Sequence, residues 1–171
     1  ILIVWTEICE GQAAYDEALR LLDQAARLPG PEDDDLALRL AVRRAWVLAR
    51  SGANDAARVA AAACLAELEA RECWADLVLA NKVLFHGAMS QSRWSDARTF
   101  LARAIVCAER AGDLREIGRL RNNMGIVLTQ EGDLRAAARE CERAAEIMRD
   151  IGDQLTLASV EVNIGVIHYK I

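Results

Sequence analysis

Two helical runs joined by a tight turn are predicted by residues 117–152, which read IGRLRNNMGIVLTQEGDLRAAARECERAAEIMRDIG. Apolar residues in the first run recur at helical spacing, at Ile117, Leu120, Met124, Val127 and Leu128. The run ends at Glu131-Gly132-Asp133, because glycine suits the left-handed position after a helix and aspartate can cap the next helix. The second run, from Leu134 to about Ile151, carries small and apolar residues on one stripe. The stretch therefore predicts a helical hairpin.

The same unit returns along the chain with a period of about 40 residues. Asn123-Met124-Gly125 recurs as Asn163-Ile164-Gly165, and small residues recur at Ala18, Ala57, Ala97 and Ala137. Such small residues let two helices approach closely. We therefore expect an all-α fold, a right-handed α–α superhelix of about nine antiparallel helices. The repeats would cover about 1–30, 36–73, 76–112 and 116–152, with a lone first helix at 154–171, in a single solenoid fragment over 1–171.

The composition argues against several classes of protein. The net charge of −5 disfavours nucleic acids and anionic membranes as partners. The apolar opening, Ile1–Trp5, is far shorter than the ~20 residues of a transmembrane helix. The five cysteines form no Cys-x-x-Cys motif, which is typical of buried thiols in a reducing cytoplasm and predicts no metal site. His86 and His168 stand alone, so we expect no enzyme activity and no cofactor.

The recurring residues resemble the tetratricopeptide repeat (TPR). Gly125, Leu128, Gly132, Leu134, Ala137 and Ala144 follow the family pattern, as do Tyr15, Ala18 and Ala25 in the first repeat and Trp94, Ala97 and Ala104 in the third. The 40-residue form is similar to repeats of kinesin light chains and G-protein-signalling modulators, and to sensor regions of large bacterial transcriptional regulators. Because almost all basic residues are arginine, the composition favours the bacterial relatives. The pattern departs at Phe85, which stands where Gly125 does, and at Arg44, which stands where Met124 does.

In the TPR family the first helices of successive repeats line a concave face, so the resemblance implies a binding groove there. It places these residues in the groove: Arg39, Arg43, Trp46, Arg50, Lys82, His86, Arg119, Asn122, Asn123 and Asn163. The first helices of repeats two to five also concentrate basic charge, at Arg39, Arg43, Arg44, Arg50, Lys82, Arg119, Arg121 and Lys170, which predicts a basic inner wall. Arginine can bind carboxylates through a bidentate fork, and asparagine amides can hold a peptide backbone. These arginines could instead pair across helices, the asparagines could satisfy local turns, and Trp46 could pack between helices.

The leading hypothesis is a protein-interaction module that binds an extended or acidic peptide, or a partner domain, in a basic concave groove. The partner could also be another domain of the same chain. The alternative is the effector-sensing region of a bacterial transcriptional regulator or signalling ATPase, in which small rotations add along the repeats. RNA binding ranks below both, because few aromatic residues are available for stacking.

Self-association is also expected, through terminal helices that lack a neighbour. The last helix would expose the apolar face formed by Leu157, Val160, Ile164 and Ile167. Because the chain starts without methionine and stops within a repeat, we expect a fragment of a longer array.

Overall fold

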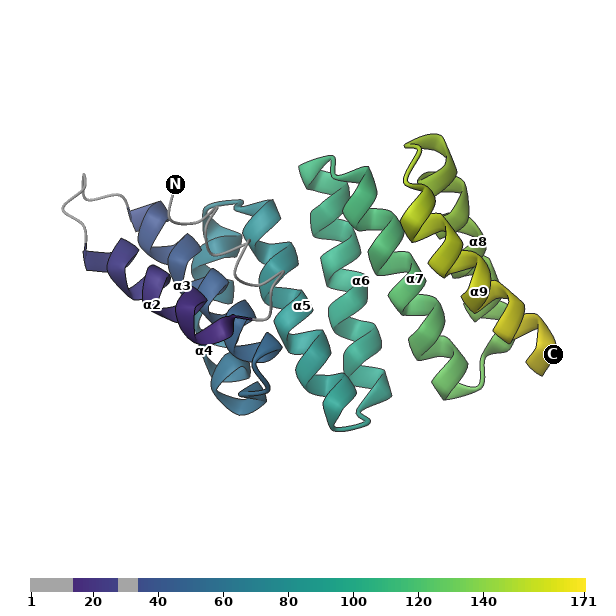
Figure 1. Cartoon of the computed structure of the whole chain (residues 1–171), viewed down its shortest axis with the longest axis horizontal. Helices are drawn as coiled ribbons and strands as arrows, with labels where there is room; N and C mark the ends of the chain where they lie inside the picture. The colour runs from purple at the N-terminus through teal and green to yellow at the C-terminus, as the bar shows by residue number, and fades with distance from the viewer. Residues whose placement is uncertain (1–13, 28–33) are drawn as a thin grey trace. The chain divides into compact units, whose positions relative to one another are not determined.

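The residues that the structure describes form helices and the turns between them. A computed structural model of the chain describes residues 14–27 and 34–171 (Figure 1). Its helices are α2 (Tyr15–Arg27), α3 (Asp34–Arg50), α4 (Asn54–Ala70), α5 (Trp74–Ser90), α6 (Trp94–Ala111), α7 (Leu114–Glu131), α8 (Leu134–Asp150) and α9 (Gln154–Lys170). The first of the nine expected helices lies outside these ranges. None of the described helices combines the length and the apolarity that crossing a membrane requires.

The helices follow one another at a constant interval. From α3 to α9 they begin at residues 34, 54, 74, 94, 114, 134 and 154, so a helix pair repeats with the period of the sequence. Each intervening turn holds one residue at positive φ, at Gly52, Glu72, Ser92, Gly112, Gly132 and Gly152. Glycine adopts this left-handed conformation without steric cost, whereas Glu72 and Ser92 adopt it at a cost, because their Cβ atoms crowd the backbone. The predicted turn at Gly132 is confirmed, with φ of 86°.

Aspartate caps three of the helices, as the sequence predicts for the turn before α8. The carboxylate of Asp133 accepts a hydrogen bond from the backbone nitrogen of Ala136. Asp113 and Asp153 make the equivalent bonds at the starts of α7 and α9. The corresponding residues before α4 and α6 are Ala53 and Arg93, and neither makes a side-chain capping bond.

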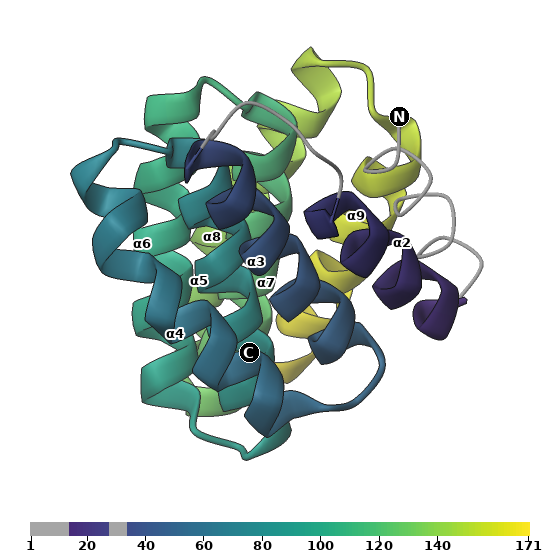
Figure 2. The ribbon, with the colours of Figure 1, turned by 90° about the vertical axis from the view of Figure 1, so that its left-hand side faces the viewer.

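The chain falls into two compact units, Ile1–Gly87 and Ala88–Ile171, named the N-terminal and C-terminal units below. In the N-terminal unit, α3 packs against both α2 and α4 (Figure 2). One cluster of its core consists of Ala18 and Leu22 from α2 with Leu40 and Val47 from α3. Alanine at position 18 has no exposed surface. It therefore lies at a close contact between helices, as the repeat pattern predicts.

In the C-terminal unit, α7 packs against α6, α8 and α9 (Figure 1). The approach of α7 to α8 depends on Gly125. A Cβ atom at Gly125 would lie well within 3.0 Å of the Cys141 sulfur and 3.2 Å from the backbone oxygen of Ala137. Cys141 and Ala137 are fully buried. Glycine and small residues therefore set the spacing of this helix pair.

The orientation of α9 differs from the expectation. Leu157, Val160 and Ile167 are buried, and Ile164 is half-buried, so the prediction that this face is exposed is wrong. Because α9 packs against α7 and α8, that face is already used inside the unit. A second apolar face, on the opposite side of the helix, is exposed instead. It consists of Leu155, Val162, Val166 and Tyr169.

Candidate functional site

In the N-terminal unit, four of the predicted site residues form a cluster around one indole ring. Trp46 lies on α3, and the Lys82 Nζ atom of α5 is 4.9 Å from its ring centroid. The Arg50 guanidinium carbon lies 6.0 Å from the same centroid, and the His86 ring centroid lies 5.4 Å from it. The distances of Lys82 and Arg50 from the indole are within the range of cation–π attraction, and His86 makes a ring–ring contact. The set of Trp46, Arg50, Lys82 and His86 is named the Trp46 cluster.

The spacing along the two helices explains how the Trp46 cluster forms. Trp46 and Arg50 are four residues apart on α3, and Lys82 and His86 are four residues apart on α5, so each pair shares a helix face. Trp46, Lys82 and His86 are half-buried, whereas Arg50 is exposed. The indole therefore packs between helices and is also partly accessible, which combines the two interpretations that the sequence leaves open.

His86 is held toward its neutral form. Burial lowers the pKa of His86, and the positive charges of Lys82 and Arg50 lower the pKa further. A neutral imidazole can donate one hydrogen bond and accept another. An anion bound beside Lys82 and Arg50 would offset their positive charges and raise the pKa of His86 part of the way back.

Arg39 and Arg43 lie near an acidic residue. A nitrogen of Arg39 is 3.8 Å from the Asp76 carboxylate of α5. Burial raises the pKa of Asp76, while the charges of Arg39 and Arg43 lower it in part. Acidic residues at the starts of the first helices, including Asp76 and Glu116, make the basic excess smaller than the sequence analysis expects.

In the C-terminal unit, two predicted amides bond to each other. The Asn163 Nδ2 atom of α9 donates to the Asn122 Oδ1 atom of α7 at 2.9 Å. Asn123, the residue one repeat before Asn163, is half-buried and has no hydrogen bond from its side chain within the described chain. A guanidinium nitrogen of Arg119 lies 3.8 Å from a carboxylate oxygen of Asp153, the residue that also caps α9. The amides thus act partly as a link between α7 and α9.

Two of the eight basic residues expected on the inner wall point to neighbouring second helices instead. Arg44 forms an ion pair with Asp23 of α2. Arg121 forms ion pairs with Glu109 of α6 at 3.1 Å and Glu140 of α8 at 2.9 Å. The prediction that Arg44 and Arg121 belong to the basic inner wall is therefore wrong.

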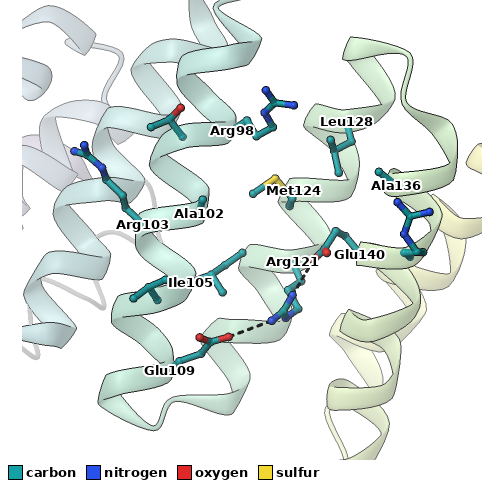
Figure 3. Close-up of a pocket in the computed structure, with 13 residues that line it drawn as sticks. Arg98, Ala102, Arg103, Ile105, Glu109, Arg121, Met124, Leu128, Ala136 and Glu140 are labelled. Carbon is teal, nitrogen blue, oxygen red and sulfur yellow. Dashed lines mark hydrogen bonds and ion pairs between the residues drawn. The ribbon is translucent and has the colours of Figure 1, made fainter.

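A groove over α7, bordered by α6 and α8, is a feature that the sequence analysis misses (Figure 3). Its volume is about 690 Å³, and Ile105, Met124 and Leu128 form an apolar part of its lining. The ion pairs of Arg121 lie in the same lining. Small side chains at Ala102 of α6 and Ala136 of α8 leave room above α7, but alanine recurs throughout the chain and does not mark this place in the sequence.

The cysteines are buried or half-buried thiols where they are described. Cys64, Cys107 and Cys141 are buried, and Cys73 is half-buried. Burial raises the pKa of Cys141 to about 11, so this thiol stays protonated at neutral pH. Within residues 14–27 and 34–171, no three His, Cys, Asp or Glu side chains gather in a way that could hold a metal ion.

Comparison with known proteins supports a TPR-like helical-repeat fold. The crystal structure of BtubC (BKLC) from P. vanneervenii matches with a TM-score of 0.81 and 17% identity, over 98% of this chain and 70% of that one. The apo form of RapI matches with a TM-score of 0.78 and 11% identity, over 99% of this chain and 47% of RapI. At these identities the likeness concerns the fold. No family model and no curated protein matches the chain. The expected α–α solenoid is thereby confirmed as the fold class.

Proposed function

We propose that this chain is a protein-interaction module that binds an extended, acidic peptide of a partner protein at a surface that includes the Trp46 cluster. The observation that carries the proposal is the placement of two cations, from Lys82 and Arg50, beside one partly accessible indole. Lysine and arginine on neighbouring helices can meet a carboxylate from two directions. The indole supplies an apolar surface for the adjoining part of the peptide.

Helix geometry favours an extended ligand over a single anion. Arg39 and Arg43 lie on the same helix as Trp46 and Arg50, at intervals of three or four residues. Basic side chains therefore follow one another along α3 over several helical turns. A peptide with acidic residues at intervals could use each of them in turn. The guanidinium groups of these arginines can also donate bidentate hydrogen bonds to carboxylates.

The asparagines of the C-terminal unit suit recognition of a peptide backbone. Asn122 and Asn163 hold each other in place, and Asn123 lies beside this pair in sequence on α7. An amide presents both a donor and an acceptor, which matches the groups of an extended backbone. Within the C-terminal unit, Asn123 is accordingly assigned a contact with a peptide backbone, while Asn122 and Asn163 position α7 and α9.

The repeat itself is assigned to the 40-residue form of the TPR family. The support is the regular spacing of the helix starts together with the recurrence of Asn-x-Gly at Asn123 and Asn163. In this assignment the chain is a regulatory or scaffold segment of a bacterial cytoplasmic protein.

The test is selection of ligands from a displayed library of random peptides. The unaltered chain should enrich peptides rich in aspartate and glutamate. The double variant Arg50→Glu/Lys82→Glu should lose these peptides, and circular dichroism should show that its helices persist. The matched control is Arg27→Glu/Arg58→Glu, which makes the same charge change at exposed residues of α2 and α4.

Two results would reject the proposal. One is enrichment of peptides without acidic residues by the unaltered chain. The other is equal loss of binding in both double variants, because this would show that overall charge, and not the Trp46 cluster, attracts the peptide.

A further inference from the structure

We propose that the groove bordered by α6 and α8 is a second binding site, which takes an acidic segment of a partner protein carrying a bulky apolar side chain. This site lies wholly within the C-terminal unit and involves none of the residues assigned to the first site. Its borders, α6 and α8, are second helices of the repeats, where the sequence analysis places no function.

The lining of the groove provides an apolar surface of the right kind for one large side chain. Ile105, Met124 and Leu128 are each exposed by only 7–8%, so they are anchored in the core beneath the groove. Beside them, Val106 is 50% exposed, which leaves an aliphatic side chain uncovered at the border. Exposed Ala102 adds little bulk. A leucine or phenylalanine of a partner could therefore contact the groove without displacing a protein side chain.

The charges in the groove select an acidic partner. Arg121 is already neutralised by Glu109 and Glu140, as the dashed lines of Figure 3 show. Arg98 forms an ion pair with Glu131, with 3.2 Å between the guanidinium nitrogen and the carboxylate oxygen. The remaining arginines of the lining, Arg103 and Arg139, are exposed and have no ion pair within the described chain. An incoming carboxylate thus meets uncompensated positive charge, whereas an incoming lysine would be repelled.

The borders of the groove also favour a protein segment. They are two helices, and Ala102, Arg103 and Val106 of α6 are exposed along one border. Figure 3 shows the guanidinium group of Arg103 turned away from Met124 and Leu128. The Arg103 side chain can turn toward a ligand along the border, because within residues 14–27 and 34–171 it has no ion pair to break. Exposed residues along this border make the groove accessible to a peptide or a helix.

A methyl signal of the protein can test the proposal directly. The chain has three methionines, of which Met124 lines the groove and Met148 is buried between α7 and α8. We would label the methionine methyl groups with carbon-13, follow their signals by NMR, and titrate the whole chain with three short synthetic peptides. The first contains leucines between glutamates, the second replaces the leucines with serine, and the third replaces the glutamates with lysine. The first peptide should shift the Met124 signal in a saturable manner and leave Met148 unchanged.

Two neighbouring arginines on α8 provide a matched pair of variants. Arg139 lines the groove, whereas Arg135 lies one turn earlier and does not, and both are exposed without an ion pair in the described chain. Arg139→Glu should weaken binding of the first peptide about tenfold, a change of ~1.4 kcal/mol. Arg135→Glu should change it less than about twofold, because a surface charge at that distance contributes little.

The proposal is overturned if Met124 does not respond, if the lysine peptide shifts it equally, or if both arginine variants weaken binding alike. The first site is tested separately. Arg50→Glu/Lys82→Glu should leave the Met124 response intact, so failure of either proposal is distinguishable from failure of the other.

Discussion

The two glycines of the repeated Asn-x-Gly motif should respond in opposite ways to the same substitution. Gly125→Ala places a methyl group against the Cys141 sulfur and 3.2 Å from the Ala137 carbonyl oxygen. Gly165→Ala, one repeat later, places the methyl group where nothing beyond the adjacent residues and the backbone of α9 lies within 4 Å. Both substitutions remove the same glycine from the interior of a helix. Packing is therefore the only large difference between them.

The expected magnitudes follow from these surroundings. Replacing a helical glycine with alanine gains about 0.5–1 kcal/mol of stability, which Gly165→Ala should show in full. Forcing an extra methyl group into a packed contact costs about 1–3 kcal/mol. Because the methyl group meets both the Cys141 sulfur and the Ala137 oxygen, the cost should lie in the upper part of this range, at about 2–3 kcal/mol, and Gly125→Ala should lose about 1–2.5 kcal/mol net. For a chain of this size, about 2–4 °C of melting temperature corresponds to 1 kcal/mol. The two variants should consequently melt on opposite sides of the unaltered protein.

Thermal unfolding followed by far-ultraviolet circular dichroism measures both changes. Cys141→Ala provides a rescue, because it removes the overlapping sulfur and leaves only the Cβ atom of residue 141, at an ordinary 3.7 Å. The double variant Gly125→Ala/Cys141→Ala should melt above Gly125→Ala alone. A stabilising Gly125→Ala would refute the reasoning. So would a double variant that loses the sum of the two single losses.

Three further changes test the turns, the helix caps and the histidine. Glu72→Gly and Ser92→Gly should each stabilise the chain by about 1 kcal/mol in urea denaturation, because glycine adopts the left-handed conformation at no steric cost. Ala53→Asp should add about 1 kcal/mol in the same assay, since aspartate at the equivalent position caps three other helices. The pKa of His86 is lowered in the folded state, so its contribution to stability is complete above its usual pKa of 6.5 and is lost as pH falls through the folded pKa. His86→Gln should therefore flatten the decline of stability on the acid side of that value.

Each of these changes has an outcome that contradicts it. Gly112→Ala is the control for the turns and should destabilise, since it introduces a side chain at φ of 71°. Equal effects of Gly112→Ala and Ser92→Gly would show that the turns do not distinguish glycine. A loss of stability in Ala53→Asp would mean that the backbone before α4 cannot form the cap. An unchanged pH profile in His86→Gln would show that other groups dominate acid unfolding.

The features that the sequence predicts correctly are local. Gly132 and Asp133 end one helix and start the next through contacts within a few residues, so their chemistry can be recognised without a fold. The period is equally visible, because the small residues that recur along the sequence, such as Ala97 and Ala137, are those on which helices pack. Such features require only propensity and spacing.

The features that the sequence does not predict depend on which face of a helix meets which neighbour. Arg119 and Arg121 are two residues apart, and this places them on nearly opposite sides of α7. The first lies near Asp153 and the second bridges Glu109 and Glu140. In α9 both faces are apolar, so periodicity alone cannot identify the buried one. The groove over Met124 needs α6 and α8 to border α7 together, which no local pattern records.

The regular succession of the helices also has a consequence for how the chain folds. In the C-terminal unit, α6–α7, α7–α8 and α8–α9 are neighbours both in sequence and in space, joined by turns of a few residues. Little loop entropy is lost when any one of these pairs closes. Chains whose contacts are so local fold fast for their size. Helix α7 packs against three helices and α9 against two, so we expect amide hydrogens to exchange slowest in α7 and progressively faster toward the end of α9.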